Sequence, residues 1–108
     1  MNEERKTYLV AKARILKALG HPTRLLIAEE LGRGERCVCE FVDMAGADYS
    51  TISRHLTVMK QAGLIEDEKR GKQVFYRLRV SCVLNFMGCI EEVIRSGAEE
   101  QIKMLKQE

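Results

Sequence analysis

The sequence predicts a mainly α-helical fold with one small β-hairpin. Apolar residues recur at the spacing of an amphipathic helix over most of the chain. Between positions 73 and 79 apolar and polar residues mostly alternate instead, which is typical of a strand. The chain has one proline and no tryptophan, which also favours helices over long rigid linkers.

Length and composition indicate one globular domain that spans residues 1–108. The residues are 45% hydrophobic and 31% charged, which is ordinary for a globular protein and excludes a disordered chain. No apolar run approaches the roughly 20 residues of a membrane helix. The polar N-terminus also lacks the apolar stretch of a signal peptide. We therefore expect a cytoplasmic protein with no membrane partner.

Local signals divide the chain into five helices and the hairpin. The helices are predicted over residues 3–19, 22–31, 38–44, 49–61 and 83–106. Gly20 ends the first helix and Pro22 begins the second, since proline suits the first helical position. Asp48 can cap the fourth helix, because its carboxylate accepts the free N–H groups of the first turn. Gly63 is a C-terminal stop.

The hairpin lies directly after the fourth helix, over residues 64–79, with Gly71 in its turn. Before it, the helices over 38–44 and 49–61 are joined by a tight turn at Gly46, as in a helix-turn-helix. A two-stranded ribbon after the second of these helices is a wing. The fold we predict is therefore a winged helix-turn-helix.

Positive charge gathers where such a fold contacts DNA. The formal net charge is only +2, but positions 54–79 hold seven Lys and Arg against three Asp and Glu, whereas positions 91–108 hold three against five. Arg54, near the start of the fourth helix, can donate two hydrogen bonds to guanine, and nearby hydroxyls suit phosphates. The predicted DNA-binding residues are Ser50, Thr51, Ser53, Arg54 and His55 on the helix, and Arg70, Lys72 and Gln73 on the wing. The hydroxyls can equally cap the helix, and the wing residues can form a solvated turn.

Along nearly its whole length the chain resembles the ArsR/SmtB family of small repressors. The matching segments are LKALGHPTRL at 16–25, ERCVCEF at 35–41, STISRHL at 50–56, GLI at 63–65 and GKQVFYRL at 71–78. Together, in this order and spacing, they are highly specific. The resemblance implies a homodimer built from the first and last helices, bound to double-stranded operator DNA. It also implies a repressor that leaves the DNA when an inducer binds.

Cys37 and Cys39 fall where the third helix starts. Free N–H groups and the helix dipole favour thiolates at such a position, and soft thiolates bind thiophilic ions. Residues i and i+2 of a regular helix point about 200° apart. We therefore expect both sulfurs to reach one ion only when the helix start is frayed or distorted. Such distortion would move the recognition helix.

The resemblance identifies Cys37 and Cys39 as the primary metal ligands. In the family a Cys-x-Cys motif at this place senses As(III) or Sb(III), and in related members it contributes to Cd(II) or Pb(II) sites. Val42 stands where arsenite-type members often carry a third cysteine, and no cysteine precedes Cys37. The zinc-sensing set of the last helix is absent, since its positions hold Val80, Cys82, Val93 and Ser96.

Cys82 and Cys89 are further candidate ligands on the last helix. They lie seven residues apart on one face, about 10.5 Å along the axis, which is too far for one ion within one chain. An antiparallel pairing of the last helices in a dimer would bring Cys82 of one chain toward Cys89 of the other. The alternative is that both are small buried side chains of the dimer interface.

Two other functions are compatible with these residues. The first is a repressor of the same fold that senses oxidants or reactive sulfur through a cysteine disulfide or polysulfide, with Cys82 as the cysteine near the start of the last helix. The second is a protein-interaction module without a DNA role, which would leave the basic wing and recognition helix unexplained. The sequence contains no phosphate-binding glycine loop and no His-Glu-x-x-His motif, so we predict that the chain is not an enzyme and has no constitutive cofactor. His21 is expected to be a loop or capping residue.

Overall fold

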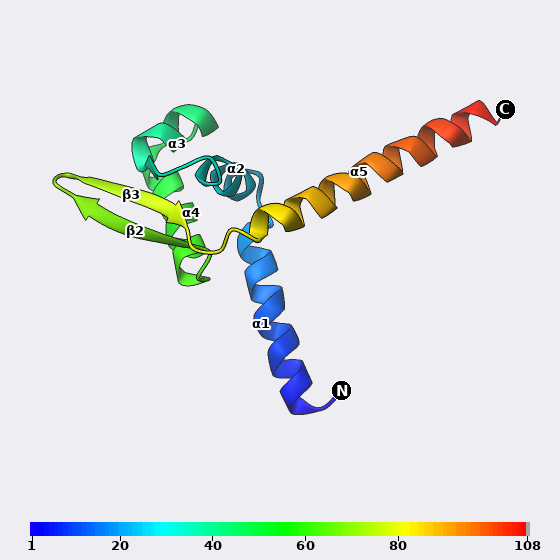
Figure 1. Cartoon of the computed structure of the whole chain (residues 1–108), viewed down its shortest axis with the longest axis horizontal. Coiled ribbons are helices and arrows are strands. Elements are labelled where there is room, and N and C mark those ends of the chain that lie inside the picture. The colour runs from blue at the N-terminus through cyan, green and yellow to red at the C-terminus, as the bar shows by residue number, and fades with distance from the viewer. Residues whose placement is uncertain (108) are drawn as a thin grey trace.

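The computed structural model describes residues 1–107 (Figure 1). Its helices are α1 (Glu3–Leu19), α2 (Pro22–Leu31), α3 (Val38–Ala45), α4 (Tyr49–Gln61) and α5 (Val83–Lys106). Its strands are β1 (Arg36–Cys37), β2 (Ile65–Arg70) and β3 (Gln73–Leu78). The helices agree with the predicted segments to within one residue. The mainly α-helical fold with a small hairpin is confirmed.

Strands β2 and β3 form the wing, which we define as residues 65–78. The two strands are antiparallel and pair from Ile65 opposite Leu78 to Arg70 opposite Gln73. Gly71 makes the turn with a φ of 64°, in the left-handed region that glycine adopts without a steric cost. The predicted hairpin is therefore present, with its glycine in the turn.

The sheet has a third strand that the sequence did not reveal. Strand β1 is two residues long and pairs antiparallel with β3, so that the sheet order is β1-β3-β2. In this register Arg36 lies opposite Tyr76 and Cys37 lies opposite Phe75. The wing is thereby attached by its backbone to the segment that precedes α3.

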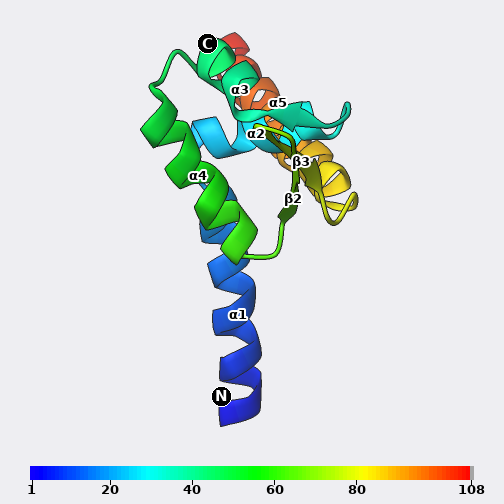
Figure 2. The ribbon, with the colours of Figure 1, turned by 90° about the vertical axis from the view of Figure 1, so that its left-hand side faces the viewer.

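The core holds α4 in place. Its side chains Ile52, Leu56 and Met59 recur at the predicted spacing and are fully buried. They join Phe41 of α3 and Ile27 of α2, which are fully buried as well. In this way α4 packs against α2, α3 and β2 (Figure 2). Each such side chain contributes about 1.5–3 kcal/mol when fully buried, so the cluster fixes the orientation of α4.

Helices α1 and α5 project from this core as two separate arms (Figure 1). Only Ala18 and Leu19 of α1 and Met87 of α5 are buried, and the molecule extends over 62 × 42 × 22 Å. Large apolar side chains along both arms are exposed: Tyr8, Leu9, Val10, Ile15 and Leu16 on α1, and Phe86, Ile90, Val93, Ile94, Ile102, Met104 and Leu105 on α5. No helix within residues 1–107 has the length and apolar character needed to cross a bilayer.

Two predicted capping residues begin their helices as expected. The Oδ1 atom of Asp48 accepts a hydrogen bond from the backbone N–H of Thr51 at 2.8 Å. The Nδ1 atom of His21 accepts one from the backbone N–H of Thr23 at 3.1 Å, directly before Pro22. Each contact satisfies an N–H group that has no partner inside its helix.

His55 of α4 is a buried polar side chain of the domain, 8% exposed. Its Nδ1 atom accepts a hydrogen bond from Nε of Arg24 at 3.0 Å, and its ring centroid lies 4.4 Å from that of His21. Burial, and then the charges of His21, Arg24 and Arg54, lower the pKa of His55 below its ordinary value. The neutral imidazole thus joins α2 to α4.

Stability should therefore decrease as the pH falls. The unfolded chain takes up a proton on His55 near pH ~6.5, before the folded state does. The free energy of unfolding is thus expected to decrease as the pH falls from about 6.5 to the lower pKa that His55 has in the folded state. Urea unfolding between about pH 7 and 5 measures this dependence, which should be flatter in His55→Gln. His21→Gln removes one of the charges that lower the pKa of His55, so its dependence should lie between those of the wild type and His55→Gln. An unchanged dependence in His55→Gln would contradict the assignment.

Candidate functional site

The first turns of α4 carry one arginine, Arg54, that forms no ion pair or hydrogen bond with the described residues. Arg54 is exposed, and no hydrogen bond or ion pair engages it within residues 1–107. The hydroxyl of Ser50 donates to Oδ1 of Asp48 at 3.0 Å, so it belongs to the cap of the helix as well as to its exposed surface. Hydrogen bonds from Thr51, and then from Ser50, hold the pKa of Asp48 below its ordinary value. The helix start is thus rigid, with Arg54 free to reach a ligand.

The other predicted residues of α4 differ in their exposure. Thr51 and Ser53 are half-buried, whereas His55 points into the domain and bonds to Arg24. A helix places successive residues 100° apart, so neighbours in sequence do not share a face. His55 therefore supports α4 from within, while Ser50 and Arg54 lie on its exposed side.

The wing carries a network of ion pairs. Both terminal nitrogens of Arg70 donate to the carboxylate of Glu35, at 2.8 and 3.0 Å, and Nη2 also donates to Glu68 at 2.9 Å. Arg77 contacts Glu66 at 2.8 Å and Glu68 at 3.2 Å. Lys72 and Gln73, at the tip, are exposed. Of the three wing residues predicted to bind DNA, Lys72 and Gln73 are thus open to solvent, whereas Arg70 is bound by carboxylates.

This network determines where the positive charge is available. Lys60 pairs with Asp67 at 3.0 Å, so all three acidic residues of segment 54–79 lie against cations of the same segment. Four cations of that segment have no ion pair within residues 1–107: Arg54, Lys69, Lys72 and Arg79. Arg54 lies near the start of α4, Lys69 and Lys72 lie on the wing, and Arg79 directly follows the wing; the helix and the wing are the two parts of this fold that contact DNA.

Cys37 and Cys39 lie together at the junction of β1 and α3. Cys37 is the N-cap of α3, with an extended backbone (φ −91°, ψ 166°), and it is 8% exposed. Cys39 lies in the first turn and is exposed. The Cα atoms are 5.5 Å apart, and the two sulfurs are joined in a disulfide. We call this pair the dithiol site when it is reduced.

The separation of about 200° within a regular helix does not apply to this pair. Cys37 precedes the helix, in agreement with the expectation of a frayed rather than a distorted helix start, and its extended backbone turns the side chain toward Cys39. The first turn of α3 remains intact, since Oε2 of Glu40 accepts the backbone N–H of Cys37 at 2.9 Å. The sulfurs of Cys37 and Cys39 thus meet beside an undistorted helix.

Cys82 is the N-cap of α5 and Cys89 lies within that helix. Both are exposed free thiols, and no group of three or more His, Cys, Asp or Glu gathers for a metal ion within residues 1–107. Cys82 lines a hollow of about 330 Å³ between α1 and α5, together with Lys12, Ile15, Leu16, Leu19, Val83 and Phe86. Within one chain the four cysteines therefore do not form a common site.

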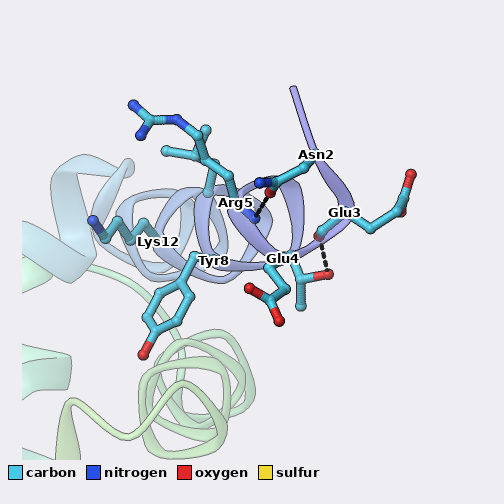
Figure 3. A pocket seen from close by; sticks show the side chains of 8 residues that line it. Asn2, Glu3, Glu4, Arg5, Tyr8 and Lys12 are labelled. Carbon is cyan, nitrogen blue, oxygen red and sulfur yellow. Dashed lines mark hydrogen bonds between the residues drawn. The ribbon is translucent and has the colours of Figure 1, made fainter.

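A second hollow runs along the first turns of α1 (Figure 3). The side chains of Glu4, Tyr8 and Lys12 project around it, and Asn2 caps the helix by accepting the backbone N–H of Arg5 at 2.8 Å. It is the open side of a projecting helix. Its charged and aromatic side chains are available to another protein surface.

Residues 21–67 match the family model described as bacterial regulatory protein, arsR family. An uncharacterised HTH-type transcriptional regulator of Methanocaldococcus jannaschii is 37% identical over 82 residues, which are 75% of this chain and 92% of that protein. The repressor SmtB of Mycobacterium tuberculosis is 39% identical over 70 residues, 65% of this chain and 52% of that one. An arsenic resistance transcriptional regulator of Pseudomonas putida is 41% identical over 68 residues, which are 59% of this chain and 51% of that protein. The chain matches about half the length of the last two.

Solved structures give the same fold. A homodimeric winged helix-turn-helix DNA-binding domain from Mycobacterium bovis superposes with a TM-score of 0.78 at 28% identity, over 93% of each chain. The repressor BigR from Xylella fastidiosa superposes with a TM-score of 0.71 at 30% identity, over 86% of this chain and 96% of that one.

These similarities confirm the family resemblance, the winged helix-turn-helix fold and the prediction that the chain is not an enzyme. The relatives are transcription regulators, and the fold presents the helix and wing with which such regulators contact DNA. The chain belongs to the ArsR family of DNA-binding transcription regulators.

Proposed function

We propose that the chain is a transcriptional repressor that leaves its operator when a thiophilic metal or metalloid binds Cys37 and Cys39. The observation that carries this proposal is the adjacency of the two sulfurs at the start of α3, the first helix of the helix-turn-helix. A ligand held by both sulfurs fixes the junction of β1 and α3. Because α3 packs on α4, a change at this junction reaches the recognition helix.

The chemistry of the dithiol site favours As(III) or Sb(III), with Cd(II) and Pb(II) as further candidates. Thiolates are soft ligands, and one sulfur is open to solvent while the other lines the core. One chain supplies two sulfurs, since no third ligand gathers there within residues 1–107. With Cd(II) or Pb(II) each thiol releases a proton on binding, so affinity for these ions is expected to fall at low pH. With As(OH)₃ the two thiol protons leave as water with two of its hydroxides, and one oxygen stays on arsenic. The Pseudomonas putida relative, named for arsenic resistance, supports a metalloid.

Operator recognition is assigned to exposed and half-buried residues near the start of α4 and to the exposed tip of the wing. Arg54 suits bidentate contact with guanine in the major groove, and Ser50, Thr51 and Ser53 suit phosphates or base edges. Lys72 and Gln73 at the wing tip suit phosphates or the minor groove. His55 acts through the orientation of α4, and Arg70 reaches DNA only by exchanging a carboxylate for a phosphate. Because its proposed partner is operator DNA, we expect the regulator to act in the cytoplasm.

A second candidate function is sensing of oxidants or reactive sulfur. Cys82, exposed in the hollow between α1 and α5, is the candidate thiol of this function on the last helix. The two functions differ in their inducer and in the cysteines on which release depends.

The exposed apolar arms support a homodimer through α1 and α5. Twelve large apolar side chains are exposed on these two helices. Soluble monomers rarely expose so much apolar surface, and large exposed apolar patches mark interaction sites. The Mycobacterium bovis domain with the same fold is homodimeric. Two chains that bury these arms against each other present two recognition helices to a two-fold symmetric operator.

Arsenite should weaken operator binding by the reduced protein about tenfold or more, the scale of a typical coupling between two sites. The operator is a duplex selected by the reduced protein from a random-sequence library, and binding is measured by fluorescence anisotropy. We expect Cys37→Ser/Cys39→Ser to bind the operator but to resist release, because both ligands are lost. Cadmium, lead, zinc and a persulfide donor are titrated in parallel.

The matched control is Cys82→Ser/Cys89→Ser, which should respond to arsenite like the wild type. The metalloid assignment is wrong when only the persulfide or an oxidant releases the DNA and this release survives in Cys37→Ser/Cys39→Ser. Loss of that release in Cys82→Ser would establish the redox function instead.

Ile94→Glu should convert the dimer to a monomer, because it places a carboxylate on the apolar face of α5. Analytical ultracentrifugation is expected to give twice the chain mass of 12.3 kDa for the wild type and one chain mass for the variant. Lys103→Glu is the control, since it adds a carboxylate nine residues on, about half a turn round the helix. A monomeric wild type, or a dimeric Ile94→Glu, contradicts the proposed interface.

A further inference from the structure

One ion pair connects the wing to a distant part of the chain. Glu35 precedes β1 by one residue and lies 35 positions from Arg70, yet both carboxylate oxygens accept from both terminal nitrogens of that guanidinium. The remaining carboxylates that bind Arg70 and Arg77, from Glu66 and Glu68, belong to the hairpin itself. Among the described residues, Glu35 is the only carboxylate from outside the hairpin that binds Arg70 or Arg77.

The same segment is joined to the wing by its backbone. Cys37, two residues after Glu35, pairs with Phe75 of β3. The guanidinium of Arg70 lies over the ring of Phe75, 5.0 Å from its centroid. Residues 35–37 therefore contact the wing through a strand pair, through the bidentate ion pair with Arg70 and through a longer contact of Glu35 with Arg77 at 3.6 Å.

The bidentate contact is sensitive to orientation. Two parallel N–H···O bonds require the carboxylate and the guanidinium to stay nearly coplanar, so a rotation of residues 35–37 weakens them more than it would a single contact. Hydrogen bonds from Arg70 hold the pKa of Glu35 below its ordinary value, and those from Glu35 and Glu68 raise that of Arg70. Both groups thus remain charged across the physiological range. A ligand that fixes Cys37 to Cys39 acts on the backbone that also carries Glu35.

We propose that Glu35 transmits the state of the dithiol site to the wing, through its paired hydrogen bonds to Arg70. This inference rests on the proposed function, because it assumes that a ligand binds Cys37 and Cys39. It makes Glu35 a positioning residue that contacts neither the inducer nor the reacting sulfurs. When the ligand binds, the pair with Glu35 changes, and the wing and Arg70 change with it.

Hydrogen–deuterium exchange of the wing amides, 65–78, tests the proposal on reduced, DNA-free protein with and without arsenite. Arsenite should change wing exchange in the wild type. In Glu35→Gln the change should be smaller by about threefold, which is the scale of a surface ion pair. The control is Glu66→Gln, which removes the same charge and another carboxylate–arginine pair from the same sheet but keeps both partners of the hydrogen bonds between Glu35 and Arg70. It should respond like the wild type.

Operator binding gives a second readout. The ratio of the Kd values with and without arsenite cancels any change in basal affinity, and it should fall by about threefold in Glu35→Gln but not in Glu66→Gln. Equal responses of Glu35→Gln and wild type in both assays overturn the inference, and so does an unchanged wing in arsenite-loaded wild type. Native mass spectrometry reports the loading. Wild-type protein that takes up no arsenite refutes the proposed function, and the inference with it.

Discussion

The architecture depends on the conformation of Cys37. Its extended backbone ends β1 and pairs with Phe75, while the same residue is the N-cap from which α3 begins. Its side chain is nearly buried, so the residue is fixed by the sheet, by the helix start and by the core together. The direction of α3, the approach of Cys39 and the position of Glu35 all follow from this one residue. A chemical event at its sulfur therefore acts on the sheet and on the helix-turn-helix at once.

The DNA-binding parts combine a rigid element with a weakly held one. Core side chains of α4 are fully buried and fix the recognition helix. The wing has little core of its own, and its ion pairs are largely exposed to solvent, where such pairs contribute only about 0–1 kcal/mol each. Phosphates can compete with carboxylates of that strength for Arg70. Regulation through the wing thus needs much less energy than a change in the orientation of α4.

Sequence patterns predicted what local physics controls. Helical spacing, the caps at His21 and Asp48, and the glycine turn of the wing were recoverable because each depends on residues a few positions apart. Strand β1 was missed, since two residues carry no periodicity. The pair between Glu35 and Arg70 was missed because it joins residues 35 positions apart. The sequence allowed the sulfurs of Cys37 and Cys39 to meet at a frayed or a distorted helix start, and it did not show that Cys37 is the N-cap.

The most direct test of the dithiol site is X-ray absorption at the arsenic edge. The sample is Cys82→Ser/Cys89→Ser protein, reduced and loaded with one equivalent of arsenite per chain, so that Cys37 and Cys39 are the only sulfur ligands among its cysteines. The account predicts two sulfur neighbours and one oxygen around arsenic, since one chain supplies two thiolates. Arsenic surrounded by oxygen alone, or by three sulfurs, would contradict it.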